Sequence, residues 1–78
     1  MPRIILDQEH LAAIQRELKS NRGVDFNTSN EEAVFSMLKY WCRESAKGDA
    51  DVESVSQKDK RYLIVGNRDF FGALQSLL

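Results

Sequence analysis

The spacing of apolar residues changes along this chain, and that change constrains the fold more than any other feature. Residues 3–6 form a short β-favouring run, Arg-Ile-Ile-Leu, which predicts a strand. The apolar residues that follow share one helix face: Leu11, Ile14 and Leu18. The same change returns near the C-terminal end, where residues 61–65 predict a strand and residues 67–78 a short helix. Two such changes within 78 residues predict an α+β fold.

The first helix carries a start signal and a stop signal. Asp7 has a side chain that can accept a hydrogen bond from an unpaired N–H of the first helical turn, so it is the expected N-cap. Gly23 is the expected left-handed stop, because a residue without Cβ adopts positive φ at little cost. The helix should therefore end near Asn21, and residues 24–30 should form a polar connection.

The second helix is predicted from about Asn30 to Lys47. Ser29 followed by Glu32 matches the capping box, in which each side chain binds the backbone N–H of the other residue. The apolar residues of this helix cover much of its circumference: Val34, Phe35, Met37, Leu38, Trp41 and Cys42. A helix with so wide an apolar surface is expected to pack on more than one neighbour.

A change of composition separates this unit from the C-terminal segment. Residues 48–60 are rich in Asp, Ser, Lys and Gly, which predicts a linker. Asn67 is then expected to cap the last helix, whose large apolar side chains are Phe70, Phe71, Leu74, Leu77 and Leu78. We expect one small domain: a strand–helix–helix unit over 1–47, the linker, and a strand–helix segment over 61–78.

The C-terminal apolar residues allow two interpretations. They either complete the domain's own core, with residues 62–65 adding a strand beside residues 3–6, or they bind a partner protein. A core built from 78 residues is modest, so a second subunit is a natural source of further burial, and a homodimer is expected. A monomer in which the two predicted strands pair within one chain is the other arrangement.

The composition argues against several classes of function. The formal net charge is −1, so no excess of positive charge marks a nucleic-acid binder. The single cysteine and the short apolar runs predict a cytoplasmic protein without a membrane segment.

Few residues suggest catalysis or metal binding. His10 is a candidate base or ligand, but a solvated histidine near a helix start is the simpler interpretation. Cys42 lies on the apolar stripe, where a free cysteine packs as a small apolar residue. Asp49, Asp51 and Glu53 lack the glycine and glutamate that a calcium loop requires at fixed positions. We therefore expect a non-enzymatic protein without a cofactor or a metal ion.

The strand and the two helices resemble the ribbon-helix-helix family of DNA-binding proteins. The resemblance covers residues 2–46: the strand at 3–6, the first helix at 7–21, and the Thr-Ser-Asn-Glu-Glu run at 28–32 that opens the second helix. It implies a dimeric transcriptional regulator or antitoxin whose N-terminal strand enters the major groove. In antitoxins a C-terminal tail binds the toxin, and residues 61–78 are similar to such a tail.

The resemblance also implies which residues meet DNA. Alternation places Arg3 and Ile5 on the face that would contact bases, opposite Ile4 and Leu6. The residues expected at the DNA backbone are Asn27, Thr28, Ser29 and Asn30. The alternative function is a non-catalytic protein–protein interaction module, such as an adaptor, an inhibitor or a small regulatory subunit, that does not bind nucleic acid. The neutral charge and the five apolar residues near the C-terminal end favour this alternative.

Overall fold

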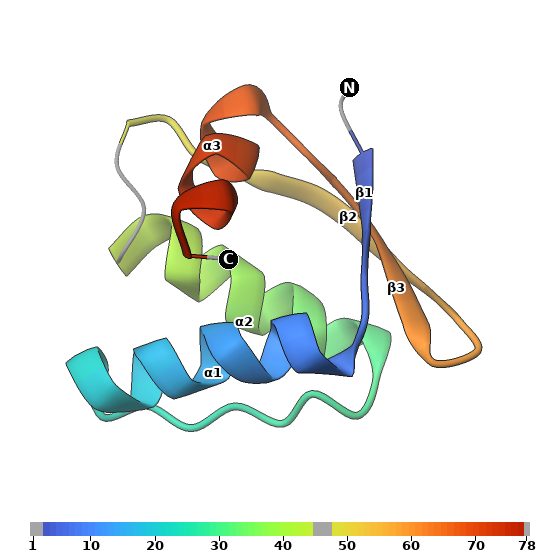
Figure 1. Ribbon diagram of the computed structural model, residues 1–78, viewed down its shortest axis with the longest axis horizontal. Coiled ribbons are helices and arrows are strands. Elements are labelled where there is room, and N and C mark those ends of the chain that lie inside the picture. The colour runs from blue at the N-terminus through green and yellow to red at the C-terminus, as the bar shows by residue number, and fades with distance from the viewer. Residues whose placement is uncertain (1–2, 45–47, 78) are drawn as a thin grey trace.

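The computed structural model describes residues 3–44 and 48–77 and shows a mixed α/β fold, which confirms the predicted class (Figure 1). The elements follow in the order β1 (Arg3–Leu6), α1 (Gln8–Arg22), α2 (Glu31–Glu44), β2 (Val52–Lys58), β3 (Arg61–Gly66) and α3 (Arg68–Leu77). The described strands form one antiparallel sheet in the order β1-β3-β2, so the strand that comes last in the sequence lies in the centre.

Helices α1, α2 and α3 lie on one face of the sheet, and none of the described elements covers the other face (Figure 1). Burial along β3 alternates accordingly, with Tyr62 and Ile64 buried and Leu63 and Val65 only partly buried. The buried core residues are Leu6, Leu11, Ile14, Leu18, Val34, Met37, Leu38, Trp41, Cys42, Val52, Tyr62, Ile64, Phe70 and Leu74. They come from all six elements, so the core lies between the sheet and the helices.

The predicted signals at the ends of α1 are confirmed. The Asp7 carboxylate accepts a hydrogen bond from the backbone N–H of His10 at 3.2 Å, and the His10 ring binds the Asp7 N–H in return. Gly23 has φ 68° and donates its N–H to the Lys19 carbonyl. The helix continues to Arg22, one residue beyond the predicted end.

The start of α2 differs from the prediction. Asn30, not Ser29, caps this helix, since its Oδ1 accepts a hydrogen bond from the Ala33 N–H at 2.9 Å. The Ser29 N–H is instead bound by the Asn27 side chain within the preceding loop. Both positions carry a residue type that can cap a helix, so the path of the loop decides between them. The helix is described to Glu44, and the rest of its predicted length, at 45–47, lies outside the described residues.

The prediction of a linker over residues 48–60 is wrong, because residues 52–58 form β2. This strand pairs with β3 in a hairpin whose loop is Asp59-Lys60, with Asp59 at φ 57°. Val52 and Val55 face the helices, and polar side chains occupy most of the remaining positions. Because one face of the strand meets solvent, its composition resembles that of a linker.

The C-terminal segment completes the core of the domain. β3 pairs with β1 in the register Ile4↔Ile64 and Leu6↔Tyr62. Phe70 and Leu74 of α3 are fully buried in the core of the domain. The interpretation in which the C-terminal apolar residues bind a partner protein is therefore wrong for these two. Phe71 is partly buried against the same core. The Leu77 side chain and Leu78, which belong to the same prediction, lie outside the described part of the structure.

Candidate functional site

The uncovered face of the sheet is the candidate binding surface in the described part of the chain. Antiparallel partners share a face, so the register assigns the outward-facing residues of the three strands directly. They are Arg3 and Ile5 from β1, Arg61, Leu63 and Val65 from β3, and Ser54, Ser56 and Lys58 from β2. We call these eight residues the open face.

An apolar strip crosses the middle of the open face. Ile5 lies opposite Leu63, and Val65 is the next outward residue along β3. Ile5 is 57% exposed and is the one large apolar residue exposed among the residues described. Leu63 and Val65 are only partly buried, because none of the helices described for this chain covers this side of the sheet. An isolated exposed isoleucine is ordinary, but here Ile5 lies beside two partly exposed apolar residues and forms a small apolar patch with them.

Basic side chains surround one end of this strip. Lys58 and Arg61 face each other across the hairpin, and Lys60 lies in the loop between them. Together with Asp59, Ile5 and Leu63 they line a shallow, open hollow at the hairpin end of the sheet. Figure 1 shows this hairpin end reaching away from the helices. The hollow therefore combines an apolar floor with a basic rim.

The strands carry more basic than acidic residues, in contrast to the chain as a whole. Residues 3–6 and 52–66 contain four basic residues, Arg3, Lys58, Lys60 and Arg61, against the two acidic residues Glu53 and Asp59. All four basic side chains are exposed, and none has an ion-pair partner within residues 3–44 and 48–77. A local excess of positive charge thus lies on a chain whose formal net charge is −1. Exposed, unpaired cations remain available to an anionic ligand.

The structure separates the two groups of residues predicted to contact DNA. Arg3 and Ile5 lie on the open face, as alternation along the strand predicted. The predicted backbone-contact loop, residues 27–30, lies on the helix side, where the carbonyl of Thr28 accepts a hydrogen bond from the buried Tyr62 at 3.1 Å. The capping oxygens of Asn27 and Asn30 already bind backbone N–H groups, as described for α2. The first group therefore lies on the open face and the second beside the core-facing Tyr62.

Sequence reasoning missed the basic residues of the hairpin. Lys58, Lys60 and Arg61 fall at the end of the segment predicted to be a linker and at the start of the next strand. The available signal was the spacing of Val52 and Val55 before a two-residue Asp-Lys loop. That signal is weak, because β2 contains a bulge between Val52 and Ser54 that interrupts the simple alternation.

The described residues offer little nucleophilic or acid–base chemistry. Cys42 is buried, and burial, followed by the nearby Asp51 carboxylate, raises the pKa of its thiol to about 11. At neutral pH the thiol stays protonated and is a poor nucleophile. The His10 ring takes part in the cap of α1. Within the described ranges no group of three or more His, Cys, Asp or Glu side chains could hold a metal ion.

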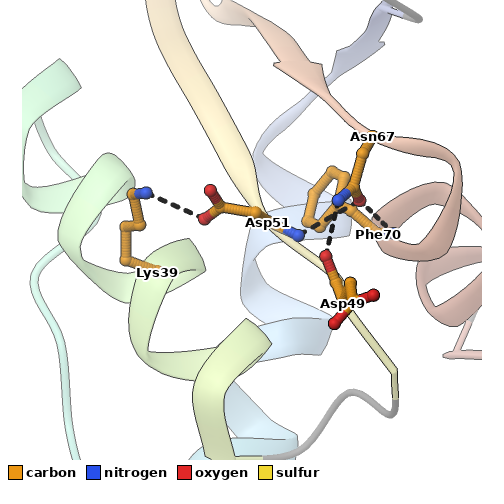
Figure 2. A network of polar contacts seen from close by, with 5 residues as sticks. All are labelled: Lys39, Asp49, Asp51, Asn67 and Phe70. Carbon is orange, nitrogen blue, oxygen red and sulfur yellow. Dashed lines mark hydrogen bonds and ion pairs between the residues drawn. The ribbon is translucent and has the colours of Figure 1, made fainter.

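A cluster of polar contacts around Asn67, shown in Figure 2, has a structural role. The Asn67 side-chain oxygen accepts hydrogen bonds from the N–H of Phe70 at 2.9 Å and from the N–H of Asp51 at 3.1 Å. Its amide donates to the Asp49 carbonyl. Lys39 of α2 pairs with the Asp51 carboxylate at 2.8 Å, and this contact lowers the pKa of that carboxyl. The cluster therefore joins α2, the start of β2 and the first turn of α3.

Two further findings concern membrane-spanning helices and similarity to known proteins. No helix in the described part of the chain is both long and apolar enough to cross a membrane. Comparison with protein-family models, with curated proteins and with solved structures finds no match for this chain.

Proposed function

We propose that this protein is a small, non-enzymatic DNA-binding protein that uses the open face and the hairpin tip to contact the DNA backbone. The observation that carries the proposal is that Lys58, Lys60 and Arg61 lie together at the hairpin end of the open face, while Arg3 lies on the same face opposite Val65. Such a protein would act as a transcriptional regulator or an antitoxin, the roles that the ribbon-helix-helix resemblance implies. The N-terminal strand remains part of the proposed contact surface, now joined by the hairpin.

The physical basis is the exchange of condensed counterions for protein cations. Each phosphate that a lysine or arginine neutralises releases counterions, so affinity falls with salt with a slope of about −0.9 per contact. Four contacts predict a slope of log K against log salt of about −3.6, or roughly a hundredfold loss of affinity between 50 and 200 mM salt. Ile5 and Leu63 would add an apolar contact between the surface of the sheet and the DNA.

The test is fluorescence anisotropy with a labelled DNA duplex across a salt series. The double variant Lys58→Ala/Arg61→Ala removes two exposed cations and should reduce the slope by about 2. The matched control is Arg16→Ala/Lys19→Ala, which removes two exposed cations from α1 and should leave the slope unchanged. A lack of binding at low salt, or equal effects of the two double variants, would overturn the proposal.

The apolar strip favours a second candidate, a protein–protein interaction module. Ile5 and Leu63 lie at the centre of the open face with charged residues at its rim, an arrangement found in many protein interfaces. In that case a protein ligand should bind with an affinity that depends little on salt. The Ile5→Ala substitution should abolish this binding. DNA binding with the slope given above decides for the first candidate.

A further inference from the structure

The residues of the open face lie in three rows that run across the sheet. Residues in one row are neighbours on adjacent strands, because antiparallel partners point to the same face. From the hairpin end, the rows are Lys58 and Arg61, then Ser56, Leu63 and Ile5, then Ser54, Val65 and Arg3. Consecutive rows are two residues apart along each strand, so the first and the third row are separated by about 13 Å.

Positive charge lies in the two outer rows and not in the middle row. Lys58 and Arg61 form the row at the hairpin end, and Lys60 adjoins them in the loop. Asp59 lines the same hollow, so three basic side chains stand against one acidic side chain there. Arg3 carries the charge of the third row. A ligand that matches the whole face therefore has negative charge at two points and an apolar group between them.

An extended peptide presents side chains at the spacing of these rows. Alternate residues of an extended chain point to the same side and lie about 6.7 Å apart, which is the repeat of a β-strand. Residues i, i+2 and i+4 of such a segment can face the three rows together. An acidic residue at i then lies near Arg3, and an apolar residue at i+2 lies on Ile5 and Leu63. The acidic residue at i+4 lies near Lys58 and Arg61.

We propose that the open face binds an extended acidic segment of a partner protein with the pattern acid-x-apolar-x-acid, where x is any residue. The segment and DNA use the same cations, namely Arg3, Lys58 and Arg61, so each ligand excludes the other. The segment thus regulates DNA binding by competition. Only this regulatory consequence rests on the proposed function, because the match between the segment and the rows of the sheet does not involve DNA.

The middle row gives the segment a contribution to affinity that salt does not screen. Ile5 is 57% exposed and lies opposite the partly buried Leu63. A leucine side chain placed on this pair removes apolar surface of both molecules from water. The ion pairs at the two outer rows involve exposed side chains and weaken as salt is added. Peptide binding should therefore decrease less steeply with salt than DNA binding.

Two end-blocked peptides of equal composition test the match, with affinities measured by NMR titration of the ¹⁵N-labelled protein. Glu-Ser-Leu-Ser-Glu has the proposed pattern, and its addition should shift amide signals of the three strands. Ser-Glu-Leu-Glu-Ser has the same charge, but its acids point away from the side that carries the leucine. It should bind about tenfold more weakly, because each exposed ion pair contributes up to about fivefold in affinity. No binding of the first peptide, or equal affinities for both, overturns the proposal.

Substitutions in the protein test the individual rows. Arg3→Gln should weaken Glu-Ser-Leu-Ser-Glu about threefold to fivefold, because one exposed ion pair is lost. Ile5→Ser should weaken it about fivefold through the loss of the apolar contact, and it leaves the buried core intact. Arg16→Gln is the matched control, since it removes an exposed cation from α1 and should leave the affinity unchanged. Equal effects of Arg3→Gln and Arg16→Gln overturn the proposal.

The DNA anisotropy assay separates this inference from the proposed function. Glu-Ser-Leu-Ser-Glu should displace labelled DNA, and Ser-Glu-Leu-Glu-Ser at the same concentration should displace at least tenfold less. DNA that stays bound when the first peptide saturates the protein overturns the shared use of the cations. DNA binding without peptide binding overturns this inference alone. Peptide binding without DNA binding overturns the proposed function and supports the segment as the ligand of the open face.

Discussion

Asn67 is the residue whose removal should reveal how the C-terminal segment is held to the rest of the domain. Its side-chain oxygen accepts two backbone hydrogen bonds, one within the first turn of α3 and one from Asp51, before β2. Its amide group binds the Asp49 carbonyl as well, as Figure 2 shows. Asn67→Ala therefore removes a helix cap and two links to the segment before β2 in a single step.

The expected cost follows from these contacts. Loss of an N-cap costs about 1 kcal/mol, and the tertiary hydrogen bonds add about 1 to 1.5 kcal/mol because the Asp51 N–H is left without its partner. We expect Asn67→Ala to lower the free energy of unfolding by about 2 to 2.5 kcal/mol. A domain of this size has a total of about 4–12 kcal/mol, so the loss is a large fraction.

Urea unfolding followed by tryptophan fluorescence measures this difference. Trp41 is buried and packs edge-on against Phe70 of α3, with ring centroids 5.8 Å apart, so its emission reports on this region. Asn30→Ala is the matched control, because Asn30 caps α2 through one hydrogen bond to Ala33. It should cost about 1 kcal/mol. If Asn67→Ala costs no more than Asn30→Ala, the tertiary bonds of Asn67 contribute nothing and the reasoning is refuted.

Three further predictions concern packing, reactivity and pH. A Cβ at Gly66 would lie 2.8 Å from a buried aromatic ring and 2.9 Å from the Asp51 carbonyl, so Gly66→Ala should destabilise the protein by about 2 kcal/mol or more. Gly72→Ala meets no atom within 4 Å inside α3 and should instead stabilise it by about 0.5–1 kcal/mol in the same urea assay; equal effects would contradict this contrast. Cys42, whose thiol pKa is raised to about 11, should resist iodoacetamide at pH 8 until urea unfolds the chain, and rapid labelling of the native protein would contradict its burial. Because the ion pair with Lys39 lowers the pKa of Asp51 from 3.8, the pair stabilises the folded state above that pH and loses its effect as pH falls through the lowered value. Both side chains are exposed, so Lys39→Ala should lower the free energy of unfolding by less than about 1 kcal/mol at pH 7. An equal loss of unfolding free energy below the lowered pKa of Asp51 would refute the ion pair as its cause.

The sequence by itself determined the helices, both ends of α1 and the start of α3. The apolar stripe at Leu11, Ile14 and Leu18 is buried as predicted, and Asp7, Gly23 and Asn67 cap helices as expected. A helix cap and a helix stripe depend on residues within one or two turns of each other. Such signals can be found in a single sequence because the interacting groups are close along the chain.

Only the tertiary structure decided the sheet and, with it, the candidate site. β1 and β3 are separated by more than fifty residues, and their pairing depends on how the helices fold back between them. β2 could not be recognised because one of its faces is open to solvent and its alternation is broken by a bulge. The basic hairpin therefore became visible only once the strands were paired. The position of Arg3 and Ile5 on one face followed from alternation alone, but their neighbours Arg61 and Leu63 came from strand pairing, which no local signal specifies.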